Sequence, residues 1–320
     1  MADAGSFSAG AGAMTAFETL ADGLLFPEGP MAFPDGSVVL VEILRGTLTR
    51  VWNGKTEIIT DLGGGPNGAA VGPDGAVYVC NNGGFAWSRD EAGNLQLSAC
   101  PPADYEGGRI ERVDLATGTF ERLYTHVDGQ ALRGPNDIVF DSAGGFWFTD
   151  LGKESERGRD KSGIYYARAD GSAIREVVYD GLTFNGIGLS PDETTLYSAC
   201  TLTGRLWSYP LTGPGEIARN AAGHPAAQLV ARLDDAAALD SMAVTEAGNI
   251  CVGTLARGGI TTFTPEGSAS FLPLPDYAVT NICFGGADRK TAYMTFSMSG
   301  QLVRMDWPEA GLPLNFVTYA

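Results

Sequence analysis

A six-fold internal repeat constrains the fold of this 320-residue chain more than any other feature of the sequence. Each copy opens with a polar residue, runs through four or five mostly apolar residues, turns at Asp-Gly or a related pair, and continues into a second apolar run; the segment 66–80 is one example. Short connections of Gly, Asp or Asn between two β-rich runs are typical of β-hairpins. The repeat therefore predicts six hairpins along the chain.

Each predicted hairpin is followed by a further strand pair that begins with glycine, as in Gly46–Val51 and Gly163–Tyr166, so each unit has about four strands. The copies open at positions 28, 67, 136, 185, 240 and 281, and all but one of the spacings are between 39 and 55 residues. Propeller blades are four-stranded and recur roughly every 40–50 residues. We therefore predict an all-β fold, a six-bladed β-propeller.

We expect residues 1–320 to form a single domain, because no flexible linker divides the chain. Residues 1–13 are expected to be flexible, and the early run 15–20 is expected to supply the outer strand that the last unit lacks. The long spacing of 69 residues hides an insertion at 85–107. Insertions of this kind lie on one face of a propeller, often the binding face, so we place it near the active site.

The opening residue of every unit carries a carboxylate or carboxamide oxygen. These residues are Glu28, Asn67, Asn136, Asn185, Asp240 and Asn281. Because the first strand of each blade lines the central channel, the six side chains should meet near the channel mouth. An alternative is that Asn and Asp before Gly simply form turns; this explains Asn67 and Asn185 but not Glu28.

Two carboxylates and several amide oxygens around one axis predict a bound cation. Without a cation the carboxylates would repel each other, and their burial would be costly. Oxygen ligands without Cys or His select Ca²⁺, Mg²⁺ or Mn²⁺. We favour Ca²⁺, while the same oxygen cage accepts Mg²⁺, Mn²⁺, Zn²⁺ or Fe²⁺.

Four motifs of the chain, taken in order, resemble the SMP-30/gluconolactonase/LRE family. They are Pro27-Glu28-Gly29-Pro30, Pro135-Asn136-Asp137, Phe184-Asn185-Gly186-Ile187-Gly188-Leu189 and Leu239-Asp240-Ser241-Met242-Ala243-Val244. The resemblance covers the chain from Phe26 to Trp307. It implies a six-bladed propeller with one catalytic divalent cation held by Glu28, Asn136, Asn185 and Asp240, and a gluconolactonase-like hydrolysis of a small-molecule lactone to the hydroxy acid.

The cation and its ligands suggest roles for individual residues. A divalent ion polarises a lactone carbonyl and activates water. Asp240 is our candidate catalytic residue, either as the base that takes a proton from attacking water or as a direct nucleophile. Asn67, Trp87 and Tyr105 are candidate substrate contacts, although the two aromatic residues could instead bury the insertion. Arg109 is expected to be an exposed strand residue.

Composition excludes several other classes of function. The formal net charge is −17, which argues against binding to nucleic acid or to an anionic membrane surface. The five cysteines are odd in number and form no cluster, so a disulfide framework and a zinc site are not expected. The N-terminus lacks the charged and apolar segments of a signal peptide, which predicts a cytoplasmic protein.

Two alternatives to a lactonase remain open at the level of sequence. One is an organophosphate-triester hydrolase of the diisopropylfluorophosphatase type, a related chemistry in the same fold, in which Asp240 attacks phosphorus. The other is a propeller that binds ligands without catalysis, because a fold alone does not imply a function. The oxygen column favours an enzyme, since a scaffold has no need for two carboxylates on its axis.

Overall fold

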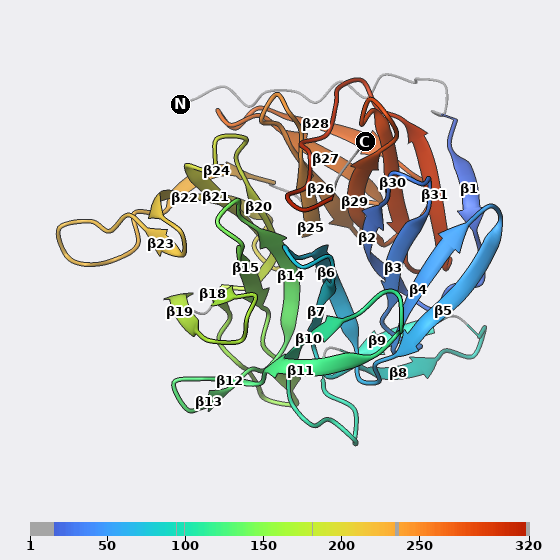
Figure 1. Ribbon diagram of the computed structural model, residues 1–320, viewed down its shortest axis with the longest axis horizontal. Helices are drawn as coiled ribbons and strands as arrows, with labels where there is room; N and C mark the ends of the chain where they lie inside the picture. The colour runs from blue at the N-terminus through green and yellow to red at the C-terminus, as the bar shows by residue number, and fades with distance from the viewer. Residues whose placement is uncertain (1–15, 94, 99, 181, 234–236, 318–320) are drawn as a thin grey trace.

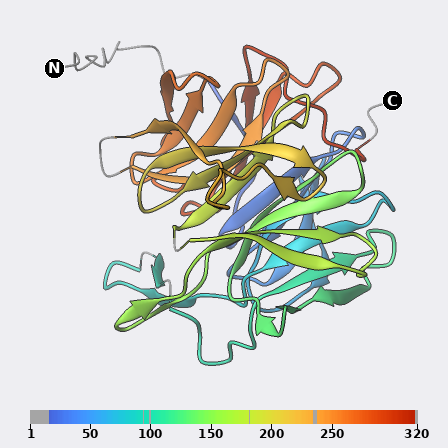
Figure 2. The ribbon, with the colours of Figure 1, turned by 90° about the vertical axis from the view of Figure 1, so that its left-hand side faces the viewer.

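The computed structural model describes residues 16–93, 95–98, 100–180, 182–233 and 237–317, and in these ranges the chain forms strands and no helix. Six antiparallel sheets surround a central axis, as the predicted six-bladed β-propeller requires (Figure 1). Seen from the side, the orange strands of the C-terminal part lie above the cyan and green strands that precede them in the chain (Figure 2). In the described ranges no helix is long and apolar enough to cross a membrane.

Every blade runs from an inner strand at the axis to an outer strand. The first three blades comprise β2 (Pro27–Ala32), β3 (Val38–Glu42), β4 (Thr47–Trp52) and β5 (Lys55–Asp61); β6 (Pro66–Val71), β7 (Val77–Asn81), β10 (Arg109–Val113) and β11 (Phe120–Tyr124); and β14 (Pro135–Phe140), β15 (Gly145–Asp150), β18 (Gly163–Arg168) and β19 (Ile174–Tyr179). The last three comprise β20 (Phe184–Leu189), β21 (Thr195–Cys200), β22 (Arg205–Gly213) and β24 (Gln228–Arg232); β25 (Ala238–Val244), β26 (Ile250–Leu255), β27 (Gly259–Phe263) and β28 (Ala269–Pro273); and β29 (Val279–Gly285), β30 (Thr291–Phe296), β31 (Gln301–Asp306) and β1 (Glu18–Ala21).

Short strand pairs lie beside the ring and are not part of its blades. They are β8 (Ala86–Arg89) with β9 (Leu95–Ser98), β12 (His126–Val127) with β13 (Gln130–Ala131), and β16 (Glu154–Ser155) with β17 (Gly158–Arg159); in addition β23 (Glu216–Ile217) pairs with the end of β22. The β8–β9 hairpin lies in the insertion predicted at 85–107 and connects the second and third strands of blade 2.

The ring closes through the N-terminal strand, as the sequence predicted. β1 pairs with β31 in an antiparallel register that places Glu18 opposite Arg304, and the two side chains form an ion pair of 2.8 Å. The first residue of the predicted run, Thr15, lies outside the described residues, as does the segment 1–13 that was expected to be flexible. The last blade therefore combines strands from both ends of the chain.

Apolar packing is concentrated between neighbouring blades. Six clusters of buried hydrophobic side chains occupy the six interfaces around the ring. Between blades 2 and 3, for example, Tyr78 and Ile110 meet Phe140, Phe146 and Phe148. Because burial of apolar surface is the main favourable term in folding, each blade is stabilised by the blade on either side.

The inner strands share a local irregularity that bears on function. In all six blades the register between the inner strand and the second strand shifts, as it does between Glu28 and Met31 or between Phe184 and Ile187. A bulge bends a strand and changes the direction in which a side chain points. Every inner strand thus bulges at its opening polar residue or directly beside it.

Glycines after three of these residues allow the inner strands to approach closely. A Cβ atom on Gly29 would lie 2.5 Å from the Asn67 carbonyl oxygen, and one on Gly68 would lie 2.4 Å from the Asn136 oxygen. A Cβ atom on Gly186 would likewise lie 2.5 Å from the Asp240 carbonyl oxygen. The Asn-Gly pairs that resemble turn formers are therefore strand residues, and their glycines are required by packing at the axis.

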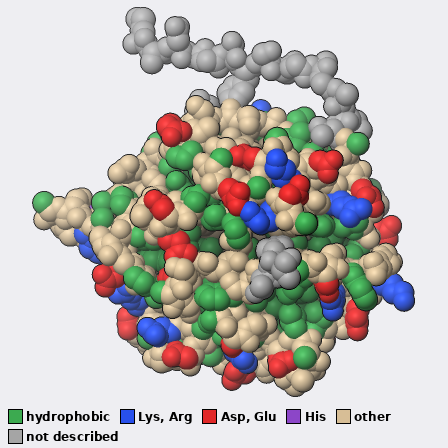
Figure 3. Space-filling model, turned by 45° about the horizontal axis from the view of Figure 1, so that its top comes forward, with side chains coloured by type: hydrophobic (Ala, Val, Ile, Leu, Met, Phe, Trp, Pro, Cys, Tyr) green, Lys and Arg blue, Asp and Glu red, His purple; other side chains and the backbone are tan. Residues whose placement is uncertain are grey.

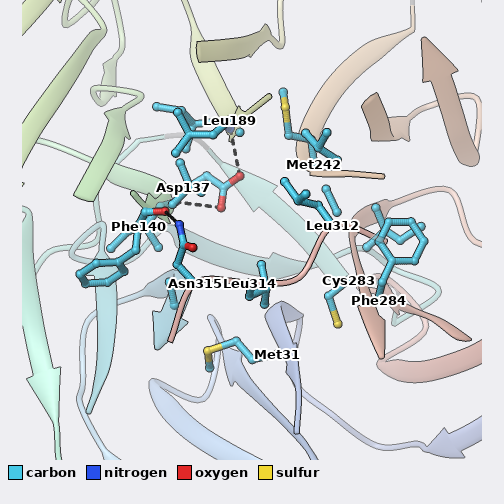
Figure 4. A pocket seen from close by; sticks show the side chains of 18 of the residues that line it. Met31, Asp137, Phe140, Leu189, Met242, Cys283, Phe284, Leu312, Leu314 and Asn315 are labelled. Carbon is cyan, nitrogen blue, oxygen red and sulfur yellow. Dashed lines mark hydrogen bonds between the residues drawn. The ribbon is translucent and has the colours of Figure 1, made fainter. Parts of the chain in front are cut away.

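The C-terminal segment crosses one end of the channel. After β31, Gly311 forms a bridge to Thr245, and Leu312 donates its backbone N–H to the Val244 carbonyl at 2.9 Å. The side chains of Leu312, Leu314 and Asn315 line the channel there (Figure 4). On the face shown in Figure 3, acidic and basic side chains are interspersed with apolar ones.

Candidate active site at the start of the inner strands

The six predicted oxygen-bearing residues all lie at or near the start of an inner strand, and all are buried. Their exposed fractions are 2% for Glu28, 5% for Asn67, 3% for Asn136, 4% for Asn185, 7% for Asp240 and 4% for Asn281. The inner strands contact one another in sequence around the axis, from β2 through β6, β14, β20, β25 and β29 back to β2. Polar side chains from six separate sheets thus surround one channel.

Glu28 is held in a fixed orientation by its neighbours. Its Oε2 atom accepts a hydrogen bond of 2.6 Å from the Gly29 backbone N–H and one of 2.8 Å from the Asn281 side-chain amide. The Asn281 amide oxygen in turn accepts the Ile282 N–H at 2.8 Å. Asn281 therefore orients Glu28, a positioning role that the sequence left unassigned.

Asp240 and Glu28 influence each other electrostatically. Burial raises the pKa of Glu28 to about 7, and burial, followed by the nearby Glu28 carboxylate, raises the pKa of Asp240 well above its usual range. The Asn185 side chain hydrogen-bonds the Asp240 carboxylate and opposes this rise. Without a cation, the two carboxylates are therefore held away from their ionised forms, because like charges in a buried site destabilise each other.

Two amide oxygens in the same ring of strands lack a hydrogen-bond donor. Asn136 Oδ1 and Asn185 Oδ1 are buried, and no described residue donates to either of them. A buried polar atom without a partner is costly, and amide oxygens together with carboxylates are ligands of hard divalent cations. In the described part of the chain no three His, Cys, Asp or Glu side chains form a metal-binding group. A divalent cation therefore fits this site only if amide oxygens are counted among its ligands. The set that meets this condition is Glu28, Asn136, Asn185 and Asp240.

Asp137 lies just below this ring and ties three inner strands together. Its Oδ1 accepts the Ile138 N–H at 2.9 Å and its Oδ2 accepts the Ile187 N–H at 3.1 Å, and the Met242 backbone also hydrogen-bonds the carboxylate. Burial, with Glu28 as the next cause, raises the pKa of Asp137 to about 7. The side chain faces a cavity of about 330 Å³ on the far side of the channel (Figure 4).

The predicted substrate contacts occupy different surroundings. Asn67 is buried at the start of β6, beside the other inner strands. Trp87 is half-buried and packs against Phe26, two residues before Glu28, with ring centroids 5.1 Å apart. Tyr105 donates its hydroxyl to the Arg133 carbonyl, and its ring lies against Gly83. Tyr105 thus packs the insertion against the segments that carry Gly83 and Arg133, while Trp87 brings the β8–β9 hairpin beside the strand that carries Glu28.

Two buried polar residues at this end of the channel were missed by the sequence analysis. Asn82 directly follows β7, and Lys153 follows β15; their exposed fractions are 2% and 3%. The Lys153 ammonium donates to Asn82 Oδ1 at 3.1 Å and to the Gly84 carbonyl at 2.6 Å. A lysine in a loop with Glu, Arg and Asp neighbours is expected to be exposed, so the sequence carries no signal for this burial.

The burial of Arg109 differs from what the sequence predicted. It was expected to be exposed, but it is 4% exposed, forms an ion pair with Glu111 and donates to the Leu62 carbonyl. Its partner Glu111 lies two residues along the same strand, where the two side chains share one face of the sheet. The pair therefore connects blade 2 to the segment that follows β5 and leaves Arg109 outside the channel chemistry.

The chain matches a known family over most of its length. The profile described as SMP-30/Gluconolactonase/LRE-like region matches residues 26–298. A gluconolactonase from Zymomonas mobilis is 26% identical over 323 aligned residues, which cover 91% of this chain and 81% of that protein. A 6-deoxy-6-sulfogluconolactonase from Pseudomonas putida is 29% identical over 204 residues, which cover 60% of this chain and less than two thirds, 64%, of that protein.

Solved structures share the fold of this chain. A gluconolactonase from Xanthomonas campestris superposes with a TM-score of 0.70 at 21% identity, covering 91% of this chain and 89% of that one. Regucalcin from Agrobacterium tumefaciens, a calcium-binding protein, superposes with a TM-score of 0.69 at 18% identity, covering 94% and 97% of the two chains. At these identities the likeness confirms the six-bladed propeller.

Proposed function

The chain belongs to the SMP-30/gluconolactonase/LRE-like family, and from this premise we propose that it is a hydrolase of lactones that depends on one divalent cation. Relatives named as lactonases support the reaction class. The observation that carries the metal dependence is the set of buried oxygens at the channel mouth, where two carboxylates of raised pKa adjoin two amide oxygens without donors.

Four side chains would hold the cation: Glu28, Asn136, Asn185 and Asp240. When bound, a divalent cation supplies Lewis acidity that polarises a carbonyl and stabilises the charge that develops on its oxygen. We favour Ca²⁺ because the donor set is made of oxygen alone. The structural neighbour described as a calcium-binding protein agrees with this choice.

Asp240 would accept the proton of the attacking water. A base must be ionised before it accepts a proton, and in the metal-free protein burial and Glu28 disfavour the ionised form of Asp240. A positive charge among the ligands would reverse that preference, since an opposite charge nearby lowers the pKa of a carboxyl group. The Asn185 side chain, which hydrogen-bonds the carboxylate, would hold it in place for proton transfer or, in the variant mechanism, for direct attack.

Substrate would enter from the end of the channel at which the inner strands begin. Asn67 lies there among the inner strands, and the β8–β9 hairpin brings Trp87 against Phe26 at the side of that opening. The insertion would thus form part of the wall around a small-molecule lactone. Tyr105 would act through packing, because its hydroxyl is already bonded to the Arg133 carbonyl.

A panel assay tests the proposal. Purified protein would be presented with glucono-1,5-lactone and other lactones, and acid release would be followed with a pH indicator. We expect hydrolysis that EDTA abolishes and that added Ca²⁺, Mg²⁺, Mn²⁺ or Zn²⁺ restores. Hydrolysis that is unchanged after exhaustive metal removal would exclude the metal-dependent mechanism.

Further arms of the panel separate the alternative functions. Diisopropyl fluorophosphate would be tested beside the lactones under identical metal conditions. Hydrolysis of the fluorophosphate in preference to every lactone would replace the proposed function with triester hydrolysis. If neither class is hydrolysed and no metal is retained, a non-catalytic ligand-binding propeller is the better description.

A further inference from the structure

Asn82 and Lys153 form a polar cluster between blades 2 and 3, at the end of the channel where the inner strands begin. Asn82 lies one residue beyond the end of β7 and Lys153 three residues beyond the end of β15. These strand ends are paired with the starts of the inner strands, since Asn81 lies opposite Pro66 and Asp150 opposite Pro135. The cluster therefore neighbours the inner-strand residues Asn67 and Asn136.

Lys153 is a buried ammonium whose direct partners are all uncharged. Its Nζ atom donates to Asn82 Oδ1 and the Gly84 carbonyl, and it lies 4.1 Å from the centre of the Phe85 ring. A protonated lysine has three N–H donors. Two of them are used by these neutral acceptors, so the protonated amine keeps one donor that no described residue accepts.

No carboxylate compensates that charge directly. Among the described residues none places a carboxylate oxygen within 4 Å of the Lys153 ammonium. Asp150 is the nearest acidic influence, but its own oxygens accept the backbone N–H groups of Arg133, Gly134 and Gly152. Burial consequently lowers the pKa of Lys153 to about 7, which marks a site where a positive charge lacks an anion.

Asn82 adds a second donor without an acceptor. Its Oδ1 atom accepts the Gly84 N–H at 2.8 Å and the Lys153 ammonium at 3.1 Å, which fixes the orientation of the amide. The Nδ2 atom of the same amide is buried and has no hydrogen-bond partner among the described residues. An unpaired buried donor is rare in folded proteins and calls for an acceptor.

We propose that Asn82 and Lys153 form a specificity subsite that receives an anionic oxygen substituent of the substrate, such as a carboxylate carried by the lactone. The subsite rests on the proposed function, because it names the class of lactone that the same site would take. An oxyanion accepts from both donors at once, and hydrogen bonds between charged groups are about twice as strong as neutral ones.

The charge of the whole protein makes such a subsite necessary for an anionic substrate. At a formal net charge of −17, the overall field repels an anion. The aromatic rings of Phe85 and Tyr105, at 4.1 and 5.6 Å from the ammonium, exclude water from one side of it. A local ammonium in a dry setting attracts an anion more strongly than one in water.

A matched pair of substrates tests the subsite. D-Glucaro-1,4-lactone carries a carboxylate where D-glucono-1,4-lactone carries a neutral hydroxymethyl group. For Lys153→Met we expect kcat/KM for the glucarolactone to fall about ten-fold or more, mainly through KM, while kcat/KM for the gluconolactone changes less than about three-fold. Equal losses with both substrates, or no loss with either, would overturn the proposal and leave the lactonase function intact.

Two further variants keep this test decisive. Lys161→Met removes the same charge from an exposed position nearby and should leave the ratio of the two kcat/KM values unchanged. Asn82→Asp is almost isosteric and places a carboxylate against Lys153, so it should also abolish the preference for glucarolactone. A normal thermal melting temperature for Asn82→Asp ensures that the result does not depend on the folding of Lys153→Met.

A binding measurement separates this proposal from the proposed function. If the wild-type protein hydrolyses neither lactone, the function fails, and isothermal titration with glucarate then tests the subsite alone. Binding that Lys153→Met and Asn82→Asp weaken about ten-fold would still support an anion subsite. Absence of glucarate binding, or equal binding to all three proteins, would overturn it.

Discussion

The two ends of the central channel are built from the same six strands and differ in almost every chemical respect. At the end where the inner strands begin, these strands carry Glu, Asn and Asp side chains that are at most 7% exposed. A few residues further along, the same strands present Met31, Leu189, Met242 and Phe284 to a cavity of about 330 Å³, which the C-terminal segment covers (Figure 4).

This difference between the two ends separates the side chains that could take part in chemistry from those that pack the fold. Burial among the inner strands raises the pKa values of the Glu28 and Asp137 carboxyl groups to about 7. In such a setting a bound cation interacts with its ligands more strongly than it would in water. The end closed by the C-terminal segment thus contributes apolar packing, and the end where the inner strands begin contributes the candidate ligands.

The largest effect expected from breaking this arrangement comes from Asp240→Asn. Because the amide cannot accept a proton from water at neutral pH, kcat for lactone hydrolysis should fall about 10³-fold, within the roughly 10²–10⁴-fold range of general-base catalysis. Circular dichroism and a melting curve would show that the propeller remains folded. Wild-type activity in this variant would remove Asp240 from the reaction.

Glu28→Gln should weaken the affinity for the cation by more than about 100-fold, because loss of an outer-shell partner alone typically costs about 10–100-fold. Titration of the metal-free protein by calorimetry measures the change. Glu57→Gln, on the exposed outer strand β5, is the matched control and should bind normally. Equal affinities for both variants would show that the cation is held elsewhere.

The stability of the metal-free protein should depend on pH in a definite direction. The pKa of Glu28 is about 7 in the folded protein and 4.5 as a reference, so the folded state retains a proton that the unfolded chain has lost between these values. The unfolding free energy must therefore fall as pH rises through this window.

Melting temperatures in EDTA at several pH values between 5 and 8 measure this fall. Saturating Ca²⁺ should make the fall shallower, since the Glu28 carboxylate is then ionised in both states. Glu28→Gln should also make it shallower without metal, while the raised pKa values of Asp137 and Asp240 keep part of the dependence. Parallel curves with and without Ca²⁺ would contradict an interaction between the cation and Glu28.

The smallest effect is expected at the closed end. Asn315 donates to the Phe140 carbonyl at 3.1 Å and to Glu193 at 2.8 Å, so Asn315→Ala should lower the unfolding free energy by about 1 kcal/mol. Denaturant titration measures this change, and kcat/KM should stay at the wild-type value. A ten-fold loss of kcat/KM would show that the two ends are coupled.

Some features could be predicted because they repeat along the chain. The period of the hairpins specified the number of blades, and the run before the first hairpin specified how the ring closes through β1. The position of Glu28, Asn136, Asn185 and Asp240 at the starts of inner strands followed from the same repeat, because strand order in a propeller is fixed by chain order.

Other features could not be predicted, because they depend on single contacts between segments far apart in sequence. The burial of Lys153 arises from Asn82 and Gly84, 71 and 69 residues away. The orientation of Glu28 depends on Asn281, 253 residues away. The residues next to a side chain in the sequence do not indicate such distant partners.

The sequence by itself determined the ring of six blades and the column of oxygens at its axis, since both follow from a pattern that is repeated six times and therefore survives local exceptions. Only the tertiary structure decided which oxygens lack donors, which carboxylates share a buried site and where a lysine lies without an anion. Hydrogen bonding and desolvation are properties of the packed surroundings of an atom, and those surroundings exist only once the blades have closed around it.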